Sequence, residues 1–227
     1  MLKNIFAVIL LTTLISNRSI SQVYEKKVLH AGESLSAINY FLFPTFADGS
    51  VNLKNGGVIP EKMNFNLVLS QIQFIGPKGD SLVLSKPESI DSLHFGGSVF
   101  FYKDGYFEIP SGTDSVRLAI FRTVSYEPMK IGALGIATHG GGMQSYTSII
   151  AENGEKSLTV NEDVSITEKT SFFFLKPDGE MQPASKSNLL KIFSNKKLVI
   201  ENYLKSDKVN FNKVPDLIRA LHFCVHG

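Results

Sequence analysis

Short apolar or alternating runs, separated by turn residues, dominate the middle of the chain. Between Val51 and Phe107 these runs are cut every few residues by Gly, Pro, Asn and Asp. Such spacing predicts consecutive antiparallel strands joined by tight turns. The strands that we expect are Ser50–Leu53, Val58–Phe65, Gln71–Ile75, Ser81–Ser85, Ser92–Phe95, Val99–Tyr102, Tyr106–Ile109 and Val116–Ser125.

Three short segments carry the turn signals that support this meander. Asp48-Gly49 is expected to form a turn before the first strand, and Asp104-Gly105 is the clearest two-residue hairpin. Lys176-Pro177-Asp178-Gly179 is expected to end a later strand region, which comprises Ser157–Val160, Val164–Thr167 and Ser171–Leu175.

Two stretches have less definite patterns. The lead-in at 22–46 contains SLSAINYFLFPTF, which fits either a buried strand or a short helix followed by a strand. The stretch at 129–148 is dense in Gly and nearly free of charge, which indicates a loop rather than a regular element.

The pattern becomes helical beyond Pro183. Ser185 can cap a first helix, a second is expected near Lys196–Lys205, and Pro215 opens a third. The apolar face of the third helix is expected to contain Leu217, Ile218, Leu221 and His222. We therefore predict a mainly β (α+β) protein: an antiparallel β-meander, roll or barrel-like body over residues 22–183, with a short C-terminal helical unit over 184–227 packed on it.

The N-terminal segment MLKNIFAVILLTTLISNRSISQ has the composition of a secretory signal. Lys3 supplies the positive charge, Ile5–Ile15 is apolar, and small residues at Ser19 and Ser21 predict cleavage before Gln22. We expect residues 1–21 to be a signal peptide and the chain to be exported, to the periplasm or to the cell surface or medium. An uncleaved N-terminal anchor is the alternative, which the short apolar run disfavours.

The leader changes the interpretation of the charge. The full chain has 23 Lys+Arg and 21 Asp+Glu, and removal of Lys3 and Arg18 leaves 21 bases against 21 acids. A chain without excess positive charge is not expected to bind nucleic acid. No later stretch is long and apolar enough to span a membrane. Cys224 is the only cysteine, so no internal disulfide is expected, and we expect a buried thiol near the C-terminus.

Two tetrapeptides resemble parts of hydrolase active sites. Gly79-Asp80-Ser81-Leu82 matches the motif of the GDSL-type esterases, with His94 or His139 as the possible base. The following SLVLS predicts a strand rather than the helix that such a nucleophile needs, so we favour a hairpin turn. His139-Gly140-Gly141-Gly142 resembles an oxyanion loop, but no Gly-x-Ser-x-Gly elbow follows.

Other residues are candidates for ligand contacts. The Gly-rich loop suggests a ligand-facing rim with His139, Gln144 and Tyr146. Outward aromatics of the hairpin, Tyr102 and Tyr106, are candidates for a carbohydrate-binding surface, with core packing as the default role.

No cofactor or metal is expected from the sequence. Gly132-Ala133-Leu134-Gly135 lacks the spacing of a dinucleotide fingerprint. His222, Cys224 and His226 are close in sequence, but they lack further Cys or acidic neighbours for a metal site.

One set of motifs resembles a group of uncharacterised exported proteins of Gram-negative bacteria. That group has the pattern K-x-G, N-[YF]-N-L, F-I-x-x-x-G-D-[TS]-L and N-P-x-x-I. The matching segments here are Lys54-Asn55-Gly56, Asn64-Phe65-Asn66-Leu67, Phe74-Ile75 with Gly79-Asp80-Ser81-Leu82, and Pro87 with Ile90, together with the tail LLKIFSNKKLVIENYLKSDKVNF. The resemblance covers about half of the mature chain. It implies export, a β-rich body and a helical tail, and it implies no activity.

These observations lead to one functional expectation and two alternatives. We expect a non-catalytic cell-envelope or secreted binding or structural module with a protein or glycan partner. The alternatives are a serine hydrolase that uses Ser81 and a carbohydrate-binding surface that uses Tyr102 and Tyr106.

Overall fold

The structure, a computed structural model, describes residues 21–33, 40–84, 86–110, 115–131, 137–139 and 162–227. Three predictions lie outside these residues: the leader up to residue 20, the strand at Ser157–Val160, and most of the Gly-rich stretch. None of the helices in the described part is long and apolar enough to cross a membrane.

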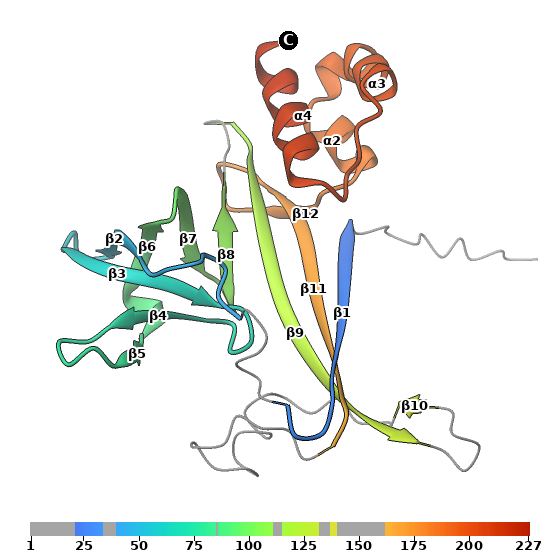
Figure 1. Cartoon of the computed structure of the whole chain (residues 1–227). Coiled ribbons are helices and arrows are strands. Elements are labelled where there is room, and N and C mark those ends of the chain that lie inside the picture. Colours follow the sequence, from blue (N-terminus) through green and yellow to red (C-terminus); the bar gives the residue numbers. More distant parts are fainter. Residues whose placement is uncertain (1–20, 34–39, 85, 111–114, 132–136, 140–161) are drawn as a thin grey trace, which may run out of the picture.

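The described residues form an extended antiparallel sheet, as predicted. Its strands follow the order β1-β11-β9-β8-β7-β6-β2-β3-β4-β5, with β12 beside β11 and β10 beside β9, and the path is not closed (Figure 1). The strands are β1 Gln22–Leu29, β2 Ala47–Leu53, β3 Val58–Asn66, β4 Gln71–Ile75, β5 Ser81–Val83, β6 Ile90–Phe95, β7 Ser98–Tyr102, β8 Tyr106–Ile109, β9 Arg117–Ile131, β10 Ala137–His139, β11 Val164–Leu175 and β12 Met181–Pro183.

One row of side chains across the sheet defines its two faces. Phe100 faces Glu108, Glu108 faces Ile120, and Ile120 faces Phe172 in successive antiparallel registers. Opposite residues of antiparallel strands share a face, so we call the face that carries this row the inner face. The other is the outer face.

Strands β2 to β7 form a curled group beside the long strands β9, β11 and β1 (Figure 1). The curl buries an apolar cluster in which the rings of Phe95 and Phe100 stack with centroids 4.5 Å apart. Burial of each such side chain stabilises the fold by about 1.5–3 kcal/mol. The cluster consists of Val51, Met63, Phe65, Ile72, Ile90, Leu93, Phe95, Phe100 and Tyr106.

Three C-terminal helices pack on the inner face of the long strands. They are α2 Lys186–Ile192, α3 Lys197–Ser206 and α4 Val214–His226. Their buried residues form one cluster with Ile120 and Phe172 of the sheet. Ser185 caps α2 by accepting from Asn188 N, as predicted.

The buried face of α4 differs in part from the expected one. Leu217, Leu221 and Cys224 are buried, and burial raises the pKa of the Cys224 thiol to about 11. The prediction that His222 belongs to this face is wrong, because its side chain is exposed.

Several strand boundaries also differ from expectation. Val164–Leu175 is one strand rather than two, and β9 continues six residues past the predicted end at Ser125. Asp48-Gly49 lies inside β2 and not in a turn. A Cβ atom at Gly49 would lie only 2.1 Å from His94 O, so glycine at this position permits the close approach of β6.

Candidate functional site

The outer edge of β1 presents backbone groups that no described strand pairs with. Phe172 N donates to Ser21 O at 3.3 Å, and the β1–β11 register continues from this pair. Antiparallel ladders alternate, so every second residue of β1 from Val23 directs its N–H and C=O towards β11. The intervening residues direct theirs away from the sheet. This outward set is Gln22, Tyr24, Lys26 and Val28.

Two large apolar side chains of β1 are exposed on the outer face. Tyr24 is 60% exposed and Val28 is 40% exposed. The Tyr24 hydroxyl donates to Gln22 Oε1 at 2.5 Å, and Lys169 Nζ lies 6.0 Å from the centre of its ring. Exposed apolar side chains on an unpaired edge are typical of a strand that takes a partner.

The inner face of β1 borders a narrow cleft. Glu25 and Lys27 line it from β1, and the remaining lining residues are Leu67, Val68, Val124, Ile166 and Glu168. Its volume is about 30 Å³, which suffices for one or two waters. A drug-sized ligand needs roughly 300 Å³ or more, so this cleft does not provide a small-molecule pocket.

Glu168 is an acid of the cleft whose pKa is raised. It lies opposite Glu25 in the β1–β11 register. Burial raises the pKa of Glu168, Arg122 counteracts this rise, Glu25 adds to it, and Lys27 counteracts it again. An additional cation near Glu25 would therefore stabilise this side of the cleft.

A buried ion pair lies next to the cleft on the inner face. Arg122 donates to Glu108 Oε2, and Ser98 Oγ donates to Glu108 Oε1 at 2.8 Å. The side chains of Arg122 and Glu108 are only 14% and 9% exposed. Both carboxylate oxygens of Glu108 accept a hydrogen bond, so these polar side chains can be buried without an unsatisfied group. They lie between the apolar cluster of the helices and that of the curled strands.

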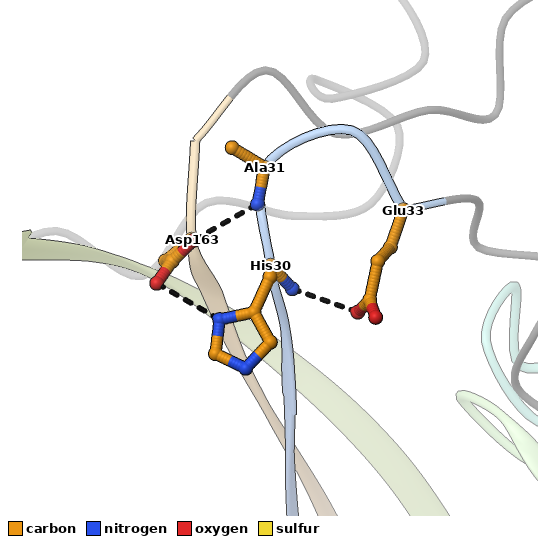
Figure 2. A network of polar contacts seen from close by, with 4 residues as sticks. All are labelled: His30, Ala31, Glu33 and Asp163. Carbon is orange, nitrogen blue, oxygen red and sulfur yellow. Dashed lines mark hydrogen bonds and ion pairs between the residues drawn. The ribbon is translucent and has the colours of Figure 1, made fainter.

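The C-terminal end of β1 is fastened by a polar network (Figure 2). Asp163 Oδ1 accepts from Ala31 N at 2.9 Å, and Asp163 Oδ2 lies 3.1 Å from His30 Nδ1. His30 N donates to Glu33 Oε2 at 2.9 Å. The bond from Ala31 N, followed by the contact with His30, lowers the pKa of Asp163. The network holds β1 against the start of β11.

This surface combines backbone donors and acceptors that point away from the described sheet, two exposed apolar side chains and charged side chains along one strand. Across the described ranges, no three or more His, Cys, Asp or Glu side chains are placed to hold a metal ion.

The two tyrosines predicted from the hairpin occupy different environments. Their rings meet edge to face with centroids 5.2 Å apart. Tyr106 is buried against Phe65, and burial, with smaller effects of Tyr102 and Glu88, raises its pKa to about 12. Tyr102 is the member of the pair with substantial exposure, so the expected outward pair of rings is not formed.

Of the residues predicted from the Gly-rich loop, the structure describes only the backbone of His139. His139 ends the backbone of β10, which pairs with β9. Gln144 and Tyr146 lie outside the described residues. Their predicted ligand-binding role stays a prediction.

Ser81 lies in the strand–turn–strand context that the sequence predicts. It begins β5 after a turn in which Gly76 N donates to Asp80 O at 2.8 Å. Its hydroxyl donates to Gln73 Oε1 at 3.0 Å. His94 lies on β6, which β2, β3 and β4 separate from β5 in the sheet order, and its Nε2 contacts Ser92 Oγ at 3.1 Å.

The C-terminal histidines lie on one side of α4. The ring centroids of His222 and His226 are 4.6 Å apart, whereas Cys224 is buried among the helices. Cys224 is therefore directed away from any ligand that the two imidazoles could share.

The sequence analysis missed the candidate residues of β1 because this strand has the composition of an ordinary polar segment. QVYEKKVL contains a signal that could have found it: apolar residues at both ends and Tyr24 between polar neighbours. The apolar run that follows β1 in the sequence has the stronger pattern, and we therefore expected the buried element there.

Comparison with known proteins adds no relative to this picture. No family model matches the chain, and neither curated proteins nor solved structures gave a significant match.

Proposed function

We propose that this chain is an exported, non-catalytic binding module of the cell envelope or secreted fraction. It binds an extended polypeptide segment as an additional strand along β1. The observation that supports this function is the set of four alternate β1 residues whose N–H and C=O groups point away from the sheet; two of them, Tyr24 and Val28, have exposed apolar side chains.

Strand addition accounts for the composition of this edge. Main-chain hydrogen bonds supply the affinity in such complexes, and alternate side chains supply the specificity. Tyr24 and Val28 would contact apolar side chains of the added strand on the outer face. Glu25 and Lys27 would select charges on the inner face, where Glu168 already lies close to Glu25.

A photo-crosslinking experiment in exporting cells tests the proposal. Benzoylphenylalanine at position 24 retains an aromatic ring at the edge of β1 and should form a covalent adduct with a bound polypeptide. Val28→Pro should abolish that adduct, because it removes an outward N–H while leaving the bonds to β11 intact. The same crosslinker at Leu198, which is 76% exposed on α3, is the matched control and should give no adduct.

Each result has a defined meaning. An adduct at position 24 that is lost in Val28→Pro supports strand addition, whatever its mass. The absence of any adduct, or an adduct that Val28→Pro leaves unchanged, overturns it.

A further inference from the structure

We infer that His222 and His226 of α4 form a binding site for a divalent transition-metal ion, with Cu²⁺ as the favoured ion and water as the remaining ligands. The inference goes beyond the proposed function, because the site lies on the helical unit and involves no residue of β1. Among the described residues, no third His, Cys, Asp or Glu joins the two imidazoles. The site is therefore one with open coordination positions on its solvent side.

The spacing of the two imidazoles matches that of rings that share one ion. Residues four apart on a helix lie on the same side, and both histidines are exposed. A metal ion lies about 2.0–2.1 Å from an imidazole nitrogen, and hence about 3.2 Å from the centre of the ring. Two rings at a ligand angle of about 90–109° therefore have centres about 4.5–5.2 Å apart. The ring centres of His222 and His226 are 4.6 Å apart, so α4 already holds them at chelating distance.

The same distance favours one kind of ion. The observed 4.6 Å lies near the lower end of that range. This end corresponds to a ligand angle of about 90°, as in the square-planar or tetragonal sites of Cu²⁺ and Ni²⁺, whereas tetrahedral Zn²⁺ needs the wider separation. Of these ions, Cu²⁺ generally binds most tightly to nitrogen ligands. The hard cations Mg²⁺ and Ca²⁺ prefer oxygen ligands and are not expected to bind.

Both imidazoles are available to a ligand. Within the part of the chain that the structure describes, neither ring makes a hydrogen bond or an ion pair. The two rings border an open hollow of about 540 Å³, which has room for an ion and several waters. Arg219 also lines this hollow, and its guanidinium donates to Asp216 Oδ1 at 2.7 Å. Part of its charge is thereby balanced, which reduces its repulsion of a bound cation.

The last turn of α4, which carries His226, is held in place. The carbonyls at a helix end have no intrahelical partners, and such ends fray. Here Lys196 Nζ donates to Gly227 O at 2.9 Å and to two further carbonyls of this turn at 3.4 Å. The ring of Phe223 stacks on that of Tyr203 from α3, with centres 3.9 Å apart. These contacts fix the helical spacing of the imidazoles before an ion binds, which lowers the entropic cost of chelation.

Copper titration of the chain without an affinity tag tests the site. Calorimetry with CuCl₂ should show one strong site per chain, and the electron paramagnetic resonance spectrum should show an axial Cu²⁺ centre coupled to two imidazole nitrogens. His222→Gln and His226→Gln should each weaken binding at least about tenfold, because the second imidazole acts on an ion that the first already holds nearby. An excess of MgCl₂ should not displace the copper.

His94→Gln is the matched control. It removes another exposed imidazole, on β6, and should change neither the affinity nor the spectrum. Absence of copper binding overturns the inference, as does a double variant His222→Gln/His226→Gln that binds copper as tightly as the parent. An equal loss of affinity in His94→Gln also overturns it, because the copper would then be held by surface histidines in general.

Circular dichroism of each variant separates loss of the ligand from loss of the fold. Both imidazoles are exposed, so the His222→Gln and His226→Gln chains should keep the helical signal of the parent. Weakened copper binding with an unchanged helical signal supports the site. Loss of binding only in variants whose helical signal also falls overturns the assignment of these two side chains as ligands.

Discussion

The buried pair of Arg122 and Glu108 provides the most direct test of the packing described above. Arg122→Met keeps the aliphatic stem and removes the guanidinium, so Glu108 retains Ser98 as its hydrogen-bond donor and loses its counter-charge. Both side chains are less than 15% exposed, which places the pair among those that water screens weakly. Breaking such a pair by removing one partner costs about 3–5 kcal/mol.

Because the Glu108 carboxylate is not wholly buried and keeps one donor, we expect the lower end, about 3 kcal/mol. In a chain of this length that loss corresponds to a decrease in Tm of about 6–12 °C. Urea unfolding followed by circular dichroism should show a lower midpoint with an unchanged m-value. The double variant Arg122→Met/Glu108→Leu removes both charges and should recover most of the loss.

The exposed pair of Arg219 and Asp216 is the matched control. Arg219 is 60% exposed, so Arg219→Met should cost at most about 0.5 kcal/mol. Two results would contradict this reasoning: Arg122→Met lowers the free energy of unfolding no more than Arg219→Met does, or the double variant is less stable than Arg122→Met alone. Either result would mean that Arg122 does not stabilise the fold by neutralising a buried Glu108.

Further predictions concern the β1 region and its processing. Lys27→Pro removes a backbone bond to β11 and should lower the unfolding midpoint, whereas Val28→Pro should leave it nearly unchanged; comparison of the two midpoints tests the outward assignment. The raised pKa of Glu168 means that its carboxyl favours folding below the ordinary carboxyl pKa, and that this contribution is lost as pH rises through the raised value. Glu168→Gln should thus equal or exceed the parent in stability at pH 7 and lose that advantage near pH 4; a variant less stable at pH 7 would contradict this sign. The pKa of Asp163 is lowered, so its contribution exists above the ordinary carboxyl pKa and is lost as pH falls through the lowered value. Asp163→Asn should accelerate amide hydrogen exchange at the end of β1 near pH 7, and equal exchange in both proteins would exclude the fastening role. N-terminal sequencing of the exported chain should begin at Gln22, and a sequence beginning at Met1 would support the uncleaved anchor.

Much of the fold could be predicted from local patterns. β4 at Gln71–Ile75 and β8 at Tyr106–Ile109 have the predicted bounds, because turn residues delimit both strands in the sequence. A hairpin at Asp104-Gly105 is confirmed, and both residues have positive φ, but the connection from Tyr102 to Tyr106 has three residues rather than the predicted two. The mainly antiparallel fold class and the three helices are confirmed as well.

The errors have physical causes that local patterns do not contain. Glycine next to Asp usually indicates a turn, but at Gly49 the constraint is the backbone of β6 at His94, 45 residues further along the chain. β9 also contains Pro128, which has no N–H to donate to a neighbouring strand. Met129 N donates to Asp163 O at 2.7 Å, and successive residues of a strand direct their backbone groups to opposite sides. The backbone nitrogen of Pro128 therefore points away from β11, so proline is tolerated because no N–H is needed there.

The candidate site depended on long-range pairing and could not be predicted in the same way. Which residues of β1 face outward follows from its register with β11, and the sequence of β1 contains no information on that register. The burial of Tyr106 likewise depends on Phe65, which comes from another strand of the curl.

The pairing of β1 with β11 has a consequence for the order of folding. His30 and Asp163, which meet where these strands come together, are 133 residues apart, whereas β6, β7 and β8 pair with immediate neighbours in the chain. Contacts between sequence-distant segments require costly loop closure, so the local hairpins should form early and the N-terminal strand should dock last. During that interval β1 has two unpaired edges, and it is then most exposed to premature association with a neighbouring chain.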